Sequence, residues 1–251
     1  FRLIGKRSGA LFCSTMSQRF YAPKLVKGEK EYTLDAFESK HLTRVLRKKE
    51  GDSIELGNGQ GDLFYGKIFI SDPKACVVHI DKSVSEPQPT YTIHLALALL
   101  KSNDRFEWCL EKATELGVHS ITPLIGAHCE KGKFNKERAL RTLQSAFKQS
   151  LNAYIPELKP EQSVIDYVGL KRNGITLIGH CYPENDKIDL FHLGASSSEY
   201  HLMIGPEGDF SLDEVKRAVE NNIKAFSLGN QRLRTETAAI VAINRILCAQ
   251  L

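Results

Sequence analysis

The spacing of apolar residues divides the chain into two regions with different patterns. Between about residues 20 and 84, short apolar segments at 52–56, 63–70 and 75–80 are separated by turn residues. The first segment ends at residues 57–59, Gly-Asn-Gly, which is a strong hairpin signal. Several short strands at this spacing predict a small β-barrel.

From residue 90 onward, apolar strands alternate with amphipathic segments, which predicts an α/β domain with a mostly parallel sheet. Helices are expected to begin at Asp104, at Asn135 and at about Thr235, and Gly117 is placed to end the first of them. Strands are expected at residues 90–100, 121–125, 175–178, 202–204 and 225–228.

A proline-rich segment at residues 86–89, Glu-Pro-Gln-Pro, separates the two regions as a linker, because closely spaced prolines disfavour both helix and central strand. We therefore expect one domain at 16–86 and a second at 90–251. Residues 1–15 carry three basic and no acidic residues and precede Met16. We expect a non-native or disordered extension there, with a transit-like peptide as the alternative.

The overall composition is that of an ordinary globular protein, with 251 residues, 42% hydrophobic and 25% charged, and a net charge of +4. Six cysteines are scattered without a C-x-x-C pair or a His/Cys cluster at metal spacing. This pattern predicts reduced thiols in a cytoplasmic protein, and no metal. No apolar run approaches the ~20 residues that a membrane span needs.

The basic charge is concentrated in residues 39–49, which have a helical pattern. Leu42, Val45 and Leu46 form the predicted apolar stripe. The remaining face is either a solvated surface or a contact surface for the phosphates of RNA. Its residues include His41, Arg44, Arg47 and Lys48.

Glycine turns follow three of the predicted strands, at Gly179, at Gly205 with Gly208, and at Gly229. Ligands of open α/β sheets collect outside the carboxyl ends of the strands. Glycine permits positive φ and close approach of the backbone to a ligand. The helix after Gly208 is well specified, because residues 211–214 form an S-x-x-E capping box. Three such turns together predict a binding site, although each alone is simply a turn.

Several familiar motifs are missing from the sequence. The dinucleotide-binding fingerprint, the P-loop, the G-x-S-x-G elbow and H-E-x-x-H do not occur. Residues 128–130, His-Cys-Glu, contain a candidate nucleophile without an identifiable orienting partner.

The turns themselves resemble a known family. Residues 205–208 (Gly-Pro-Glu-Gly), 228–229 (Leu-Gly) and 233–238 (Leu-Arg-Thr-Glu-Thr-Ala) are similar to signature segments of the RsmE family of SPOUT-class methyltransferases. Residues 111–118 and 144–150 resemble its helices, so the likeness extends from about Arg19 to the end of the chain.

This resemblance implies a PUA-like RNA-binding barrel followed by a trefoil-knotted SPOUT domain, assembled as a homodimer. It also implies S-adenosylmethionine as methyl donor and N3 of a uridine in 16S ribosomal RNA, or in the assembled small subunit, as the substrate. Two positions depart from the family pattern. Asp209 stands where a glycine is common, and Arg232 lies three places after Gly229 where the family has an arginine two places after the glycine.

Roles for individual residues follow from the turns, the basic segment and the resemblance together. The expected catalytic residues are Arg234 and Glu207. RNA contacts are expected from His41, Arg44, Arg47, Lys48 and Arg232. Cofactor contacts are expected from Ile178, Gly179, His180, Ile204, Gly205, Gly208, Leu228, Gly229, Leu233, Thr235 and Thr237.

The expected chemistry rests on charge. Attack by N3 on the methyl group requires loss of the imide proton, and negative charge then spreads onto the flanking carbonyl oxygens. A fixed Arg234 would stabilise that charge more in the transition state than in the ground state. The alternative for Arg234 is an ion pair with Glu207 or Glu236. Thr235 is either a helix cap or a catalyst, and Glu207 either a base or a residue that orients the loop.

Two other classes of function stay open. The chain could be a non-catalytic RNA-binding protein, or a methyltransferase of the same fold that acts on tRNA ribose.

Overall fold

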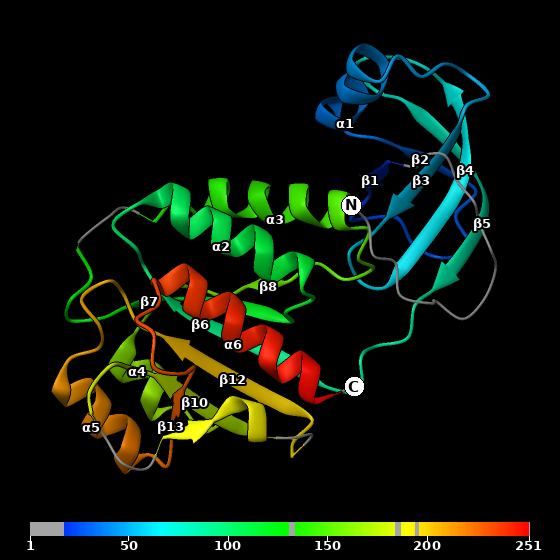
Figure 1. Ribbon diagram of the computed structural model, residues 1–251. Helices are drawn as coiled ribbons and strands as arrows, with labels where there is room; N and C mark the ends of the chain where they lie inside the picture. Colours follow the sequence, from blue (N-terminus) through cyan, green and yellow to red (C-terminus); the bar gives the residue numbers. More distant parts are fainter. Residues whose placement is uncertain (1–17, 131–133, 184–186, 194–195, 251) are drawn as a thin grey trace.

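The computed structural model describes residues 18–130, 134–183, 187–193 and 196–250, which contain two separate sheets (Figure 1). The first has five strands in the order β1-β3-β4-β5-β2, and the second has eight. The chain passes from one to the other between Ser85 and Thr92. The predicted extension at residues 1–15 lies outside the described residues.

The first sheet contains the predicted hairpin. Strands β3 and β4 are antiparallel, and Gly57 pairs with Leu63 across the turn. The predicted third strand continues further than expected, as far as Ser85. The strands of this sheet are β1 (Arg19–Tyr21), β2 (Glu31–Thr33), β3 (Ser53–Gly57), β4 (Asp62–Ile70) and β5 (Val77–Ser85).

The basic helical segment is shorter than predicted. It consists of α1 (Ala36–Lys40) and a π-helical turn, η1 (His41–Val45). The wider turn rotates its last residue, so Leu42 is fully buried whereas Val45 is 64% exposed. The predicted apolar stripe is therefore wrong at Val45. Arg47 has φ 54°, so the chain leaves the helix well before residue 49.

In the second sheet every pairing between described strands is parallel, as the alternating pattern predicted. Its order is β11-β13-β10-β12-β6-β7-β8, and β9 also pairs with β7. The trefoil knot stays a prediction. The strands are β6 (Thr92–Ala98), β7 (Ser120–Ile125), β8 (Glu157–Leu158), β9 (Gln162–Ser163), β10 (Ile175–Gly179), β11 (Ile188–Asp189), β12 (Glu199–Ile204) and β13 (Lys224–Ser227).

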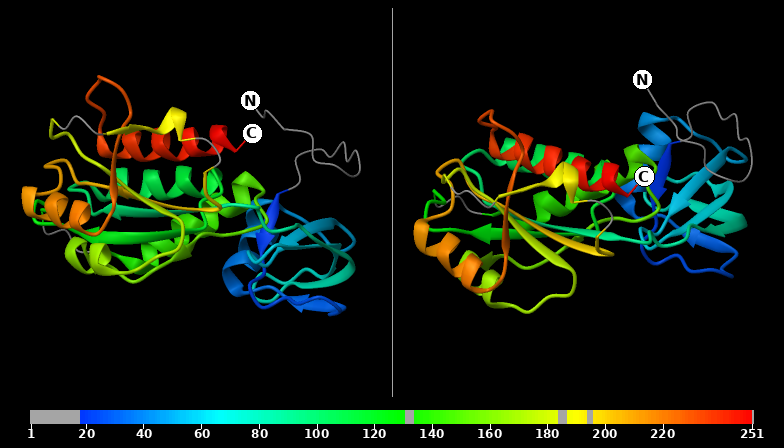
Figure 2. Two further views of the ribbon diagram at one scale, coloured as in Figure 1. Left: turned by 90° about the horizontal axis from the view of Figure 1, so that it is seen from below. Right: turned by 60° about the horizontal axis from the view of Figure 1, so that its bottom comes forward.

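Helices cover both faces of this sheet (Figure 2). One face packs against α2 (Asn103–Glu115), α3 (Lys136–Ser150) and α6 (Thr235–Ala249), together with the short η2 (Leu190–His192). The other face packs against α4 (Val164–Gly169) and α5 (Leu212–Glu220). Alternate strand residues supply the two cores, as the pleat of a strand requires.

Most of the predicted helix ends are correct. Asn135 caps α3, Thr235 begins α6, and Gly117 follows α2 with φ 76°. The predicted start of α2 at Asp104 is wrong, because the cap is Ser102, whose hydroxyl accepts a hydrogen bond from the backbone of Arg105.

Among the described residues no helix is long and apolar enough to cross a membrane.

The two parts of the chain are joined by a packed contact. Phe147 of α3 lies so close to Gly57 that a Cβ there would be 2.9 Å from its ring. The guanidinium of Arg19, 2% exposed, bonds Glu55 at 2.8 Å and the backbone oxygen of Asn152. These contacts hold the first sheet against α3.

Candidate active site

A pocket of about 850 Å³ lies at the carboxyl ends of three neighbouring strands, β10, β12 and β13, and reaches the start of α6. This is the position that the strand topology predicts for a ligand site. Segments between residues 179 and 238 form its wall. Twelve of the predicted site residues line it: Gly179, His180, Ile204, Gly205, Glu207, Gly208, Leu228, Gly229, Arg232, Leu233, Arg234 and Thr235.

Other predicted residues lie elsewhere. The Ile178 side chain is fully buried in the core beneath α4 and α5, and Thr237 is exposed on α6; neither lines the pocket. Arg232, predicted to bind RNA, lies in the pocket wall. The remaining predicted RNA contacts, His41, Arg44, Arg47 and Lys48, belong to the first domain.

The turn glycines have two different roles. Gly229 has φ 112°, a conformation that L side chains rarely adopt, and a Cβ there would meet no atom within 4 Å. At Gly179, by contrast, an added Cβ would be 2.7 Å from the Phe226 ring, and Gly205 and Gly208 similarly face Phe210 and His128. At these three glycines the close approach is to protein side chains, whereas the sequence suggested a ligand.

Asp209 ties two of the turns together. Its φ is 65°, a left-handed conformation that glycine adopts freely and that aspartate tolerates better than most residues. Its carboxylate accepts hydrogen bonds from the backbone N–H of Cys181 and of Phe210, both at 2.7 Å. The first of these bonds joins the turn after β12 to the turn after β10.

His128 holds the same turn from the other side. Its Nδ1–H donates to the carbonyl oxygens of Gly208 and Asp209, at 3.0 and 3.2 Å. The neighbouring Cys129 accepts from the backbone N–H of Gly126 at 3.1 Å, and burial raises the pKa of its thiol. A raised thiol pKa disfavours the thiolate that a nucleophile needs, and the contacts of His128 and Cys129 are those of residues that hold the loop.

Arg105 of α2 stands between two carboxylates of the site. Its guanidinium lies 4.0 Å from Glu207 and 3.8 Å from Glu236, and the second oxygen of Glu207 accepts a long hydrogen bond from the backbone N–H of Lys101. Arg234 forms no ion pair within the described part of the chain. The alternative of an ion pair between Arg234 and either glutamate is therefore wrong, because Arg105 takes that place.

Arg234 instead occupies the cap position of α6 with φ −70° and ψ 155°, and its side chain does not cap the helix. Glu236, in the first turn of that helix, is 8% exposed, and its Oε2 has no hydrogen-bond partner among the described residues. The guanidinium of Arg234 is thus left at the pocket wall without a carboxylate to neutralise it.

Nine of the 21 lining residues were not predicted, Lys187 among them, and neither was Arg105, which contacts Glu207 beside the pocket. Arg105 follows the carboxyl end of β6, which neighbours β12, so the topological rule that selected Gly205 applied to it as well. Lys187 gave no such signal. Its ammonium closes the turn after β10 by donating to the carbonyl oxygens of His180 at 2.7 Å and Tyr182 at 2.6 Å.

Comparison with known families assigns a class to this fold and pocket. A model described as RNA methyltransferase domain matches residues 86–247, and one described as RNA methyltransferase PUA domain matches residues 34–81. These two matches, one over the second sheet with its pocket and one within the first sheet, make the chain an RNA methyltransferase with a PUA domain.

Individual relatives narrow the class. The ribosomal RNA small subunit methyltransferase E of Rickettsia conorii is 30% identical over 207 residues, which cover 82% of this chain and 84% of that protein. A methyltransferase of Legionella pneumophila solved with S-adenosylmethionine has a TM-score of 0.84 at 30% identity, covering 94% of this chain and 98% of its own. The Neisseria gonorrhoeae small subunit methyltransferase E, bound to S-adenosylmethionine, has a TM-score of 0.82 at 25% identity, covering 93% and 98%. The chain belongs to the ribosomal RNA small subunit methyltransferase E family, as its motifs predicted.

Proposed function

We propose that this chain is an S-adenosylmethionine-dependent methyltransferase that modifies N3 of a uridine in 16S ribosomal RNA. The observation that carries the proposal is the strand-end pocket, whose wall contains an arginine without an ion-pair partner among the described residues. Relatives with the same architecture are named for small-subunit RNA, and two of the related structures hold S-adenosylmethionine.

The residues present fit this cofactor. The pocket has a volume in the range of small-molecule sites, and Ile204, Leu228 and Leu233 supply apolar surface suited to an adenine ring. The turns at Gly205 and Gly229 bring backbone N–H and C=O groups to the wall, where ribose and amino-acid groups need hydrogen-bond partners. When bound, the cofactor supplies an electrophilic methyl group on a sulfonium.

Arg234 carries the catalytic part of the proposal. As N3 loses its proton, negative charge develops on the uracil carbonyl oxygens, and the unpaired guanidinium of Arg234, whose backbone is placed by the start of α6, would stabilise that charge in the transition state. Glu207 is held by Arg105 and by the Lys101 backbone, which supports the role of orienting the loop over that of a general base. The macrodipole at the start of α6 adds to the positive potential there.

The partners follow from the same proposal. Phosphate contacts are assigned to His41, Arg44, Arg47 and Lys48 of the first domain, with Arg232 close to the reacting base. A homodimer and action in the cytoplasm are further expectations of family membership.

One experiment tests reaction and substrate together. Small-subunit RNA, free and within assembled subunits, is incubated with the protein and labelled S-adenosylmethionine, digested, and mapped by mass spectrometry. We expect a single 3-methyluridine. A 2′-O-methyl nucleotide, or methylated tRNA, would refute the N3 assignment, and binding of RNA without cofactor binding in calorimetry would favour the non-catalytic alternative.

A further inference from the structure

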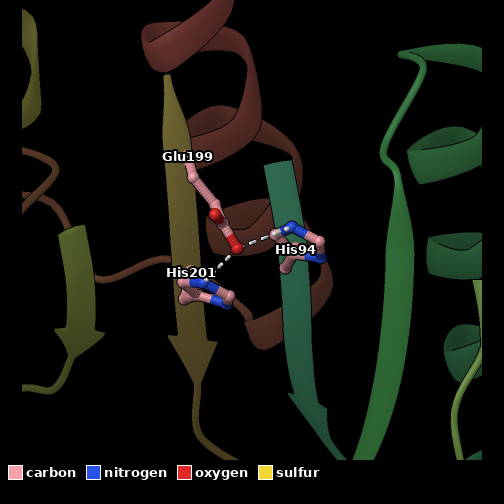
Figure 3. A group of neighbouring side chains, drawn as sticks. All are labelled: His94, Glu199 and His201. Atoms are coloured by element: carbon pink, nitrogen blue, oxygen red, sulfur yellow. Dashed lines mark hydrogen bonds and ion pairs between the residues drawn. The ribbon is translucent and has the colours of Figure 1, made fainter. Parts of the chain in front are cut away.

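A second group of side chains lies at the other end of the sheet from the pocket. His94 is near the start of β6, and Glu199 and His201 are at the start of β12 (Figure 3). The two strands are parallel neighbours, and His94 pairs with His201 in their register. Glu199 lies two residues before His201, so its side chain is on the same face. His94 lies more than a hundred residues before the other two, which is why no sequence motif showed the group.

The polar atoms of this group converge on one point. Glu199 Oε1 lies 3.1 Å from His201 Nε2 and 3.5 Å from His94 Nε2, and all three candidate ligand atoms are within 4.8 Å of one another. For bonds of about 2.0–2.1 Å, the edge of a tetrahedron around Zn²⁺ is roughly 3.3 Å. Two of the three edges therefore match already. The third edge joins two stacked imidazoles, and the His201 ring would have to rotate to shorten it, because Ser120 holds the His94 ring.

The surroundings also suit a metal ligand. A histidine that binds a metal through one ring nitrogen usually forms a hydrogen bond through the other. His94 Nδ1 lies 2.7 Å from Ser120 Oγ, a residue on β7 that is its partner in the strand register. This bond fixes the ring with Nε2 toward Glu199.

Two nearby cations are engaged elsewhere. The ammonium of Lys159 pairs with Glu157 at 2.6 Å. The guanidinium of Arg172 lies 3.6 Å from the centre of the Tyr167 ring and donates to the backbone oxygens of Tyr167 and Leu170. The competing partner of His201 Nε2 is the backbone oxygen of Asn173 at 3.2 Å, so metal binding would require the neutral imidazole to give up this bond and carry its proton on Nδ1.

We propose that His94 Nε2, Glu199 Oε1 and His201 Nε2 bind a divalent transition-metal ion of the Zn²⁺ type. Two imidazoles and one carboxylate are an established zinc ligand set, with water in the fourth position. The ion would join the amino ends of β6 and β12, two central strands of the sheet. The pocket lies at the opposite, carboxyl ends of the strands. The ion would bridge those two strands at a site separate from the pocket.

Calorimetric titration of chelator-treated protein with Zn²⁺, and the visible spectrum of the Co²⁺-substituted protein, test the site. We expect one ion per chain, a tetrahedral Co²⁺ spectrum, and a melting temperature raised by roughly 5 °C at zinc concentrations of about a hundred times Kd. His94→Gln and Glu199→Gln should each weaken binding at least tenfold. His119→Gln is the matched control, because its ring lies 5.2 Å from that of His94 but is not part of the group.

Two results would overturn the proposal. One is the lack of stoichiometric binding by the intact chain. The other is binding that survives both variants, which would place the ion on different residues. Because a variant can fail to fold, zinc-edge anomalous scattering from crystals of the unmodified protein gives an independent answer: a peak among the three side chains supports the site, and none there refutes it.

Discussion

Asp209 offers the sharpest test of how the cofactor pocket is held together. Its carboxylate forms two hydrogen bonds to backbone N–H groups, of Cys181 and Phe210, while its backbone has φ 65°. A hydrogen bond to a charged group contributes about 1.5–3 kcal/mol. At this half-buried site we take about 1 kcal/mol for each. The left-handed conformation costs a residue with a Cβ roughly 1–2 kcal/mol, and less for Asp and Asn.

Three substitutions separate these contributions. Asp209→Ala loses both bonds and keeps the unfavourable φ, so the observed conformation of the turn should be destabilised by about 2–3 kcal/mol. If half of this free energy is lost from binding, the affinity for S-adenosylmethionine falls roughly tenfold. Asp209→Gly loses the bonds but relieves the backbone, and should weaken binding about threefold. Asp209→Asn keeps an acceptor oxygen and tolerates positive φ, and should stay within about twofold.

Isothermal titration of each variant with S-adenosylmethionine, accompanied by thermal melts, measures these differences. Asp213→Ala is the matched control, because Asp213 is an exposed residue of α5 that forms an ion pair with Arg217 one turn later. If Asp209→Ala binds the cofactor as tightly as the unmodified chain, the bond to Cys181 does not shape the pocket. If Asp209→Gly binds more weakly than Asp209→Ala, the argument from φ is wrong.

Three further predictions concern catalysis, stability and RNA binding. Arg234→Ala should lower kcat at least a hundredfold and change cofactor affinity less than twofold, as measured by single-turnover methylation and calorimetry; loss of cofactor binding would contradict its role. Burial, aided by His201 and His119, lowers the pKa of His94 from 6.5 to about 4, so the unfolded chain takes up that proton first and stability falls as pH drops below about 6.5. In the presence of chelator we expect a loss of about 2 kcal/mol in the free energy of unfolding between pH 7 and 5, largely removed by His94→Gln; equal losses in both proteins would contradict the assignment. Arg44→Ala combined with Arg47→Ala should remove about two phosphate contacts, so the plot of log affinity for RNA against log salt concentration becomes less steep in filter binding. An unchanged slope would exclude these residues from the interface.

The fold was predictable where local chemistry decides it. The capping box of Ser211 with Glu214 and the glycine after α2 need only a few neighbouring residues, and both are present in the structure. The start of α2 was misplaced because Ser102 and Asp104 are both good caps and only the observed hydrogen bond distinguishes them. Val45 was misplaced because apolar spacing assumes an α-helical turn, whereas this segment forms a π-helical one.

The site was predictable in position but not in its internal contacts. Strand ends and glycines located the pocket, because the carboxyl ends of parallel strands meet at one edge. The bond from Cys181 to Asp209 spans 28 residues, and the ion pairs of Arg105 join α2 to residues more than a hundred positions later. No local pattern reports such pairs. For this reason the sequence alone left open an ion pair for Arg234 that the structure assigns to Arg105.

The packed joint between the two domains has a consequence for the choice of substrate. Lys148 of α3 and Glu38 of α1 form an ion pair at 2.6 Å with both side chains largely buried, beside the contact of Phe147 with Gly57. A joint of this kind resists hinge motion, so the basic segment of the first domain and the pocket keep a constant separation. If the basic segment binds RNA phosphates as proposed, we expect methylation only of an RNA whose fold places a uridine at that distance from those phosphates. A short flexible oligonucleotide, which has to be ordered first, is therefore expected to be a poorer substrate than folded RNA.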